Sequence, residues 1–373
     1  MSSSSKASVI VVGGGLAGLT NALHLAQSGV EVVLFEKDAF PRHKVCGEYI
    51  SNEVLPFLQH LGVNPFELGA TPISRCSLSS IKGREVQATL PLGGFGISRF
   101  LLDNHLQQKC VEAGVQLIED SVLHIQFSGK EFQVRTKSHG DWTAELVIGA
   151  YGKRSRLDKE HGREFMEEKA PYLAVKRHFA GEFPEDLVAL HNFKGGYCGV
   201  SKVEEGRINV CYLADYSAFK PYRDIDRFER EVVRRNPHLA RCFQEFEPLF
   251  ESPMTISQVS FAPKERVYQQ VLMSGDSAGM IHPLCGNGMG MAIGSAEILS
   301  NLILRYRKGE FSSRTALGAA YDQQWRQQYR KRLLAGRMFS ALFSRNQLFD
   351  QAVSVLTHVP VLLPFFVRQT HGS

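Results

Sequence analysis

The chain has 373 residues, of which 43% are hydrophobic and 22% charged, and its net charge is +5. These values exclude a disordered or low-complexity chain and predict a soluble globular protein of one large domain or two interleaved ones. Seven scattered cysteines include no CxxC pair, so we expect reduced thiols, no disulfide framework and no metal site.

No stretch reaches the roughly 18 apolar residues that a membrane-spanning helix needs. The opening residues, MSSSSKAS, lack the apolar core of a signal peptide. We therefore expect a cytoplasmic protein with no nucleic acid partner, and leave open a peripheral contact with a membrane.

The first predicted elements are a strand, a helix and a second strand. Residues 7–12 (ASVIVV) and 30–36 (VEVVLFE) are apolar runs rich in β-branched residues, as in buried parallel strands. Between them, Leu19, Ala22, Leu23 and Ala26 recur at helical spacing, and Gly29 predicts the end of that helix.

Further elements follow in a mixed order. Residues 98–114 predict a helix capped by Ser98 and stopped by Gly114. Residues 72–90 and 171–213 are rich in short alternating strands, whereas 144–152 and 271–279 predict buried strands that end in glycine turns. After Gly288 the chain is largely helical. This order predicts a nucleotide-binding domain interrupted by a sheet domain.

The turn after the first strand matches a dinucleotide-binding motif. Gly13, Gly15 and Gly18 fit GxGxxG between a strand and a helix, and Glu36 ends the next strand. The glycines and the helix N-terminus favour a pyrophosphate, and Glu36 would accept hydrogen bonds from ribose hydroxyls and repel the 2′-phosphate of NADP. The alternative is a purely structural glycine turn.

A second motif favours FAD over NAD at this site. Asp276 follows a buried strand and precedes a turn and helix containing Pro283, Gly286, Asn287 and Gly288. The aspartate can bind a ribityl hydroxyl, and the helix N-terminus can stabilise negative charge on a reduced flavin. The alternative role of Asp276 is a helix cap.

These residues together carry a family resemblance. VVGGGLAGL with LFEK, HKVCGE, and GDSAGMIHPLCGNGMGMAI resemble group A flavoprotein monooxygenases, and most closely the branch of geranylgeranyl reductases and flavin-dependent halogenases. The resemblance implies an α/β fold: a Rossmann-like FAD-binding domain of the para-hydroxybenzoate hydroxylase / glutathione reductase type, an inserted, mostly antiparallel substrate sheet and a helical C-terminus. We assign residues 7–71, 96–170 and 263–310 to the FAD-binding domain, 72–95 and 171–262 to the substrate domain, and 311–373 to the helical region.

The resemblance also implies site residues. Arg42 and Lys44 would flank the cofactor, and the turn of Cys46, Gly47 and Glu48 would lie near the isoalloxazine ring. These three and Pro283 are the catalytic candidates, although Cys46 could equally be a small apolar filler. The predicted contacts of non-covalent FAD are Gly13, Gly15, Ala17, Gly18, Glu36, Lys37, Arg42, Lys44, Cys46, Gly47, Arg99, Gly152, Gly275, Asp276, Gly286, Asn287, Gly288 and Met289.

Two of these positions carry further alternatives. Arg99 resembles the family arginine that contacts FAD phosphate or ribityl oxygens, but it could be a solvated helix residue. IGAYGKRSRLD resembles the family loop GADGxxSxxR, with Ser155 and Arg156 matching and Tyr151 in place of the aspartate. That departure puts direct NADPH docking in this loop in doubt.

Several reactions fit such a cofactor site. We favour a monooxygenase that hydroxylates an aromatic, polyketide-like or lipid-like apolar substrate with reduced flavin and oxygen, with NADH, NADPH or a flavin source as reductant. The alternative is a double-bond reductase of the geranylgeranyl reductase type. A halogenase is less favoured because Trp142 and Trp325 are isolated and form no WxWxIP motif. A non-catalytic flavin-binding subunit is least favoured.

The C-terminal region is basic, with ten Lys and Arg residues against two acids between residues 304 and 346. Arg326, Arg330 and Arg337 fall at helical spacing. We expect an apolar face that packs on the protein, formed by Leu333, Leu334, Met338 and Phe339. The cationic face is either simply solvated or a docking surface for an anionic membrane or an acyl-carrier partner.

Overall fold

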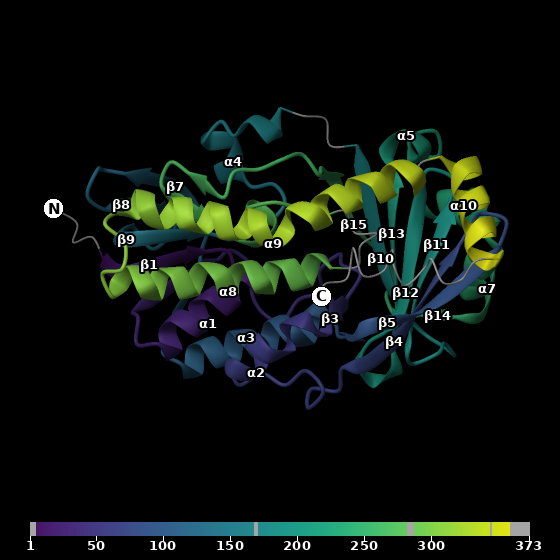
Figure 1. Cartoon of the computed structure of the whole chain (residues 1–373), viewed down its shortest axis with the longest axis horizontal. Coiled ribbons are helices and arrows are strands. Elements are labelled where there is room, and N and C mark those ends of the chain that lie inside the picture. Colours follow the sequence, from purple (N-terminus) through teal and green to yellow (C-terminus); the bar gives the residue numbers. More distant parts are fainter. Residues whose placement is uncertain (1–4, 168–170, 282–286, 344, 359–373) are drawn as a thin grey trace.

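Two β-sheets lie side by side along the long axis of the molecule (Figure 1). This computed structural model describes residues 5–167, 171–281, 287–343 and 345–358. The predicted α/β fold with one parallel and one largely antiparallel sheet is confirmed. The residue ranges assigned to the domains stay predictions.

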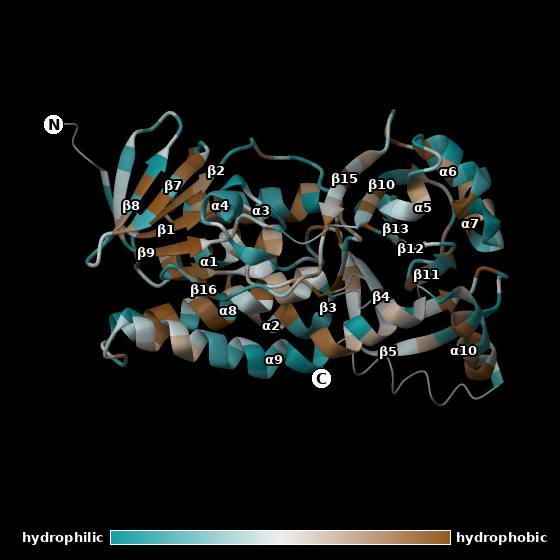
Figure 2. Cartoon of the chain, turned by 90° about the horizontal axis from the view of Figure 1, so that it is seen from above, coloured by the Kyte–Doolittle hydropathy of each residue, from teal (hydrophilic) through white to brown (hydrophobic). Residues whose placement is uncertain are grey.

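The first sheet is built around parallel strands in the order β16-β17-β9-β1-β2-β6, with a β7–β8 hairpin joined to β9. Both apolar runs predicted near the N-terminus are strands of this sheet, and they are brown along their buried length in Figure 2. Their bounds are β1 (Ser5–Val12), β2 (Val32–Glu36), β6 (Gln116–Glu119), β7 (Val122–Phe127), β8 (Phe132–Thr136), β9 (Asp141–Gly149), β16 (Val267–Tyr268) and β17 (Val271–Met273).

Helices cover this sheet, and their ends follow the predicted signals. The first helix, α1 (Leu16–Gln27), packs between α3 (Arg99–Glu112) and α8 (Gly288–Arg307), which explains why nearly all of its side chains are buried. Ser98 caps α3 by accepting a hydrogen bond from Leu101 N at 3.1 Å. Gly29 and Gly114 follow their helices with φ of +78° and +86°, a region that favours glycine.

The second sheet has the order β14-β10-β13-β12-β11-β4-β5-β3, with β15 added beside β10. All its pairs are antiparallel except β11 with β4. Its strands are β3 (Tyr49–Ser51), β4 (Thr71–Ser79), β5 (Glu85–Gly96), β10 (Tyr172–Ala180), β11 (Leu187–Phe193), β12 (Gly196–Lys202), β13 (Ile208–Asp215), β14 (Glu247–Pro248) and β15 (Met254–Val259).

The two faces of this sheet have different neighbours. On β13, Ile208, Val210 and Tyr212 join a core with α6 (Ile225–Glu231) and α7 (Pro237–Glu245). Cys211 and Leu213 alternate with these residues and point to the opposite face of the sheet, where they line a cavity. The helix α10 (Asn346–His358) lines the same cavity. The remaining short helices are α2 (Leu55–His60), α4 (Arg156–Glu160) and α5 (Tyr216–Phe219).

The long helix α9 (Arg314–Phe343) corrects one prediction. Its buried stripe runs through Leu317, Tyr321, Trp325 and Tyr329. The stripe continues at the partly buried Leu333, whereas the next residue is turned by about 100° around the helix axis. The expectation that Leu334 and Met338 face the protein is therefore wrong, because they are 49% and 74% exposed. The side chain of Phe339 lies outside the described residues.

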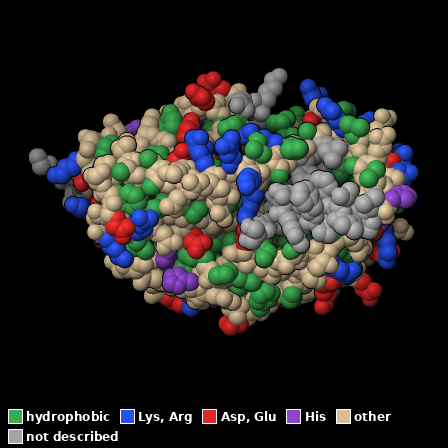
Figure 3. Space-filling model, in the orientation of Figure 1, with side chains coloured by type: hydrophobic (Ala, Val, Ile, Leu, Met, Phe, Trp, Pro, Cys, Tyr) green, Lys and Arg blue, Asp and Glu red, His purple; other side chains and the backbone are tan. Residues whose placement is uncertain are grey.

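Arg326, Arg330 and Arg337 are exposed on α9, as expected of a cationic face. Figure 3 shows Lys and Arg side chains gathered near the middle of this side of the molecule. Arg326 forms an ion pair with Asp322 at 2.7 Å, one helical turn away. No helix in the described part of the chain is both long and apolar enough to cross a bilayer.

Candidate active site

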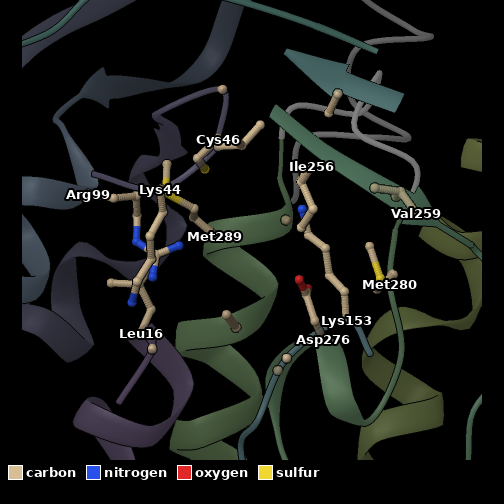
Figure 4. Close-up of a pocket in the computed structure, with 18 of the residues that line it drawn as sticks. Leu16, Lys44, Cys46, Arg99, Lys153, Ile256, Val259, Asp276, Met280 and Met289 are labelled. Atoms are coloured by element: carbon tan, nitrogen blue, oxygen red, sulfur yellow. The ribbon is translucent and has the colours of Figure 1, made fainter. Parts of the chain in front are cut away.

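A single cavity of about 1420 Å³ joins the carboxyl ends of the parallel strands to the second sheet. Typical small-molecule sites occupy roughly 300–1,000 Å³. The volume is therefore large enough for a dinucleotide together with a second molecule. Figure 4 shows residues from both ends of this cavity.

The turn between β1 and α1 is built for close approach of a ligand to the backbone. A Cβ on Gly13, whose φ is +108°, would lie 2.4 Å from Ala150 O, and one on Gly18 would lie 1.8 Å from Gly13 O. Gly15 differs, because its Cβ would meet only Arg99 Nη2 at 3.8 Å and would point into the cavity. The absence of a side chain at Gly13 and Gly18 thus lets the turn pack closely against Ala150 and against its own backbone. Gly15 instead leaves space for a pyrophosphate at the N-terminus of α1.

Glu36 ends β2 beside this turn. Its carboxylate accepts a hydrogen bond from Gly14 N at 2.6 Å and from Asp38 N at 3.2 Å, and pairs with Arg42 at 2.8 Å. Glu36 and Arg42 both line the cavity. The carboxylate therefore borders the cavity beside the glycine turn, and its contact with a ribose stays a prediction.

Two cations stand over the start of α1 and share one buried carboxylate. Asp103 accepts hydrogen bonds from Arg99 Nε at 2.6 Å and from Lys44 Nζ at 2.7 Å. Burial alone would raise the pKa of Asp103, but Arg99 and Lys44 outweigh burial and hold it below its usual range. Two cations against one carboxylate leave a positive charge beside Gly15, which suits a phosphate. The sequence analysis missed Asp103, although it lies four residues after Arg99 on the same helix face.

The Cys46–Gly47–Glu48 turn is held from beneath by a buried polar network. Glu48 is fully buried with a φ of +53°, and its carboxylate accepts hydrogen bonds from Lys176 Nζ, from His178 Nε2 at 2.6 Å and from Arg99 N at 2.8 Å. Burial alone would raise the pKa of Glu48, but the hydrogen bond from His178 and the charge of Lys176 outweigh it and lower that pKa.

The outer side of the same turn faces the cavity. Asn209 on β13 donates hydrogen bonds to Cys46 O at 3.2 Å and to Gly47 O at 2.8 Å. A Cβ on Gly47 would meet nothing within 4 Å, so this backbone presents open space to a ligand. Lys176, His178 and Asn209 were missed by the sequence analysis, and their only signal is a polar side chain within a buried strand.

The loop after β9 and the loop after β17 are tied together. Gly152 N donates to Ser277 Oγ at 2.9 Å, and the buried Lys264 donates to Asp276 O at 2.8 Å. Tyr151, at the position of the family aspartate, donates its hydroxyl to Met273 Sδ at 3.3 Å. Its phenol therefore fixes the loop to the sheet and supplies no carboxylate.

Most of the predicted FAD contacts come together at one end of the cavity. Residues between Gly13 and Lys44 line one side, and Gly152, Gly275, Asp276, Gly288 and Met289 line the other. Gly18 and Asn287 do not line it; Asn287 Nδ2 instead donates to Glu53 Oε1 at 2.5 Å. Arg332 of α9 also binds Glu53, at 2.8 and 2.7 Å, and this ion pair was not predicted. Pro283 and Gly286 lie outside the described residues. All the assigned contacts stay predictions.

The other end of the cavity is apolar. It is lined by strand residues that include Cys76, Leu78, Val188, Leu190 and Leu213, and by Phe349, Ala352, Val355 and Leu356 of α10. Asp350 anchors this helix to the β4–β5 hairpin through Ser80 at 2.8 Å and Arg84 at 3.3 Å. The sequence analysis did not assign α10 to the substrate site, although Phe349, Ala352, Val353 and Leu356 show helical amphipathic spacing.

The glycine cradle, the paired cations and the open backbone at Gly47 fit FAD in the first half of the cavity. Among the described residues, no three His, Cys, Asp or Glu side chains gather in a way that could hold a metal ion. Because the glycine turn and the apolar end share one cavity, the site can bind a dinucleotide beside an apolar molecule.

Comparisons with known proteins agree with this geometry. The family model described as FAD binding domain matches residues 6–331. The chain is 26% identical over 359 residues to digeranylgeranylglycerophospholipid reductase 2 of Methanopyrus kandleri, covering 90% of this chain and 86% of that protein. It is 25% identical over 333 residues to the FAD-dependent monooxygenase ausM of Penicillium brasilianum, covering 80% and 70%. The fold matches the flavin-dependent brominase Bmp2 with a TM-score of 0.81 at 16% identity, over 98% of this chain and 94% of that one.

Proposed function

The chain belongs to the FAD binding domain family and is an FAD-dependent oxidoreductase, and from this premise we propose that it is a monooxygenase of an apolar substrate. The observation that carries the proposal is the continuous cavity, in which the predicted cofactor contacts open directly onto an apolar chamber. Aromatic, polyketide-like and lipid-like molecules suit such walls.

Bound FAD would supply electron transfer and oxygen activation. One oxygen atom would enter the substrate and the other would leave as water, with two electrons from NADH, NADPH or a reduced flavin. The residues of this chain would do the rest. Leu190, Leu213 and Phe349 exclude water from the reaction volume. Asn209 holds the Cys46–Gly47 backbone at the boundary between cofactor and substrate, and Glu48 fixes the end of this turn through Lys176 and His178.

A double-bond reductase is the second candidate. The similarity to an archaeal lipid reductase across 90% of this chain favours it. So does the resemblance of GDSAGMIHPLCGNGM to that branch, because hydroxylases usually carry a histidine at the position of Gly279. Such an enzyme would add two electrons and two protons across a carbon–carbon double bond. A halogenase is less favoured, because Trp142 and Trp325 are buried in the hydrophobic core around the parallel sheet and do not line the cavity.

Isotope labelling separates the two candidates. The holoenzyme is reduced and mixed with a panel of phenolic, polyketide-like and prenyl compounds, in one arm under argon and in the other under labelled dioxygen. We expect a product that gains one labelled oxygen atom, and none under argon. A product that gains two hydrogens under argon would reverse the assignment.

We also propose that the exposed face of α9 contacts an anionic membrane surface. Arg330 and Arg337 lie beside the exposed side chains of Leu334 and Met338, and interfacial contact uses such a combination of cations and apolar groups. An acyl-carrier protein presents similar chemistry and is the alternative partner.

A further inference from the structure

Lys153 lies where the cofactor half of the cavity meets the apolar half. It follows β9 in the loop of Tyr151 and Gly152 and lines the cavity. In Figure 4 its side chain extends from near Asp276 toward Ile256 of β15. The ammonium group therefore lies between Asp276, the predicted ribityl contact, and Ile256 on the apolar wall of the cavity (Figure 4).

The ammonium of Lys153 has no protein partner in the described ranges of the chain. Several other cations on the cavity wall have carboxylate partners: Arg42 pairs with Glu36 at 2.8 Å, and Lys44 and Arg99 share Asp103 at 2.7 and 2.6 Å. For Lys153 Nζ there is no hydrogen bond or ion pair with a described residue, Asp276 included. Its charge is therefore available to a ligand.

The backbone that carries this side chain is fixed. Lys264, only 4% exposed, donates its ammonium to Lys153 O at 2.6 Å and to Asp276 O at 2.8 Å. Burial lowers the pKa of Lys264 to about 8. Gly152 N is bound to Ser277 Oγ at 2.9 Å. These two hydrogen bonds fix the backbone from which the Lys153 side chain extends.

The chemistry of the neighbourhood limits what that ligand can be. A molecule that fills the chamber beside Ile256 and Leu213 displaces the water that solvates the Lys153 ammonium. Removing water from an unpaired charge is costly, so a molecule that brings an anionic group binds here more favourably than a neutral one. A neutral hydrocarbon would leave the ammonium unsatisfied.

We propose that Lys153 recognises an anionic head group of the substrate, a carboxylate or a phosphate, and that the substrate is an amphipathic acid whose apolar body fills the chamber under α10. This inference rests on the proposed function and names the substrate class of the same cavity. It also sets the orientation of the substrate, with the acidic end toward the cofactor.

Ligand titration of the FAD-loaded protein tests the inference. Dodecanoate, dodecyl phosphate and neutral dodecanol are added below their micelle concentrations while the flavin absorbance is followed. We expect at least one acid to bind roughly ten- to hundredfold more tightly than dodecanol, the range of a charge-assisted hydrogen bond. The stronger of the two acids identifies the head group.

Variants complete the test. Lys153→Met is expected to abolish the preference for the acid and to leave dodecanol binding and FAD content unchanged, whereas Lys153→Arg retains the preference. Lys137→Met removes an exposed cation from the cavity wall and is the matched control. Equal affinity of acids and alcohol in the wild type would overturn the inference, as would no binding of either acid by absorbance and by equilibrium dialysis. Loss of FAD from Lys153→Met would instead assign the residue to the cofactor. Absence of FAD from the wild type would contradict the proposed function itself.

Discussion

Replacing Glu48 by alanine leaves the ammonium of Lys176 buried without its carboxylate. Glu48, Lys176 and His178 are each 0% exposed, so water cannot take the place of the lost partner. Glutamate and alanine both carry a Cβ, so the strain of the positive φ of 53° at position 48 is the same in the wild type and in the variant. The difference between them reports the polar network.

The magnitude follows from breaking a fully buried ion pair, which costs about 3–5 kcal/mol of unfolding free energy. Typical total stabilities are about 5–15 kcal/mol, so the loss is a large fraction of the whole. Replacing Glu48 and Lys176 together by methionine removes the charge that was left unpaired, and we expect it to recover most of the loss. Glu185→Ala is the matched control: this glutamate is 81% exposed and pairs with Lys202 only at 3.6 Å, so we expect a change under about 1 kcal/mol.

The assay is urea unfolding followed by fluorescence and circular dichroism, at saturating FAD and without it, because a bound cofactor adds its own free energy. The pH dependence gives a second readout. Since the pKa of Glu48 is lower in the folded state than its ordinary value of 4.5, its stabilising contribution is present above that value. It is lost as the pH falls through the folded-state pKa, and Glu48→Ala should lack this loss. A loss under 1 kcal/mol in Glu48→Ala, or a double variant no more stable than the single one, would refute the reasoning.

Three further predictions concern the cofactor, the cavity and the basic helix. Glu36→Ala should weaken FAD binding by about 1–3 kcal/mol in equilibrium dialysis, and Gly15→Val should weaken it more, because its side chain fills the cradle; unchanged occupancy in both would make this turn purely structural. Asp350→Ala should release α10 from Ser80 and Arg84 and speed proteolysis within 346–358 without changing FAD content, and an unaltered cleavage rate would show that the anchor is dispensable. Changing Arg326, Arg330 and Arg337 to Glu should reduce sedimentation with anionic vesicles at low salt, as should added salt, since such attraction is screened beyond roughly 8–10 Å; equal recovery with neutral and anionic vesicles would count against a membrane and leave a carrier partner to be tested by direct binding.

The cofactor half of the site could be predicted from the sequence because its signals are local. Gly13, Gly15 and Gly18 lie within six residues of one another, and their spacing reflects one strand–turn–helix unit. Ser98 and Gly114 likewise mark the ends of α3 through contacts within a single helix. Such features depend little on the rest of the fold.

The network beneath Cys46 could not be predicted, because its members come from distant parts of the chain. Glu48 meets Lys176 and His178 of β10, and Asn209 of β13 meets the turn from another strand. Only the pairing of β10 with β13 brings these groups together. In the same way, Leu334 and Met338 are apolar residues of a helix, and the sequence does not reveal that the buried stripe of α9 passes them by.

The most direct test of the account is the flavin content of the purified protein. We predict a yellow protein that releases an equimolar amount of free FAD into the supernatant on denaturation, since the open cradle at Gly15 and Gly47 and the paired cations Lys44 and Arg99 provide for non-covalent binding. A colourless protein that gains no flavin spectrum on titration with FAD would contradict it.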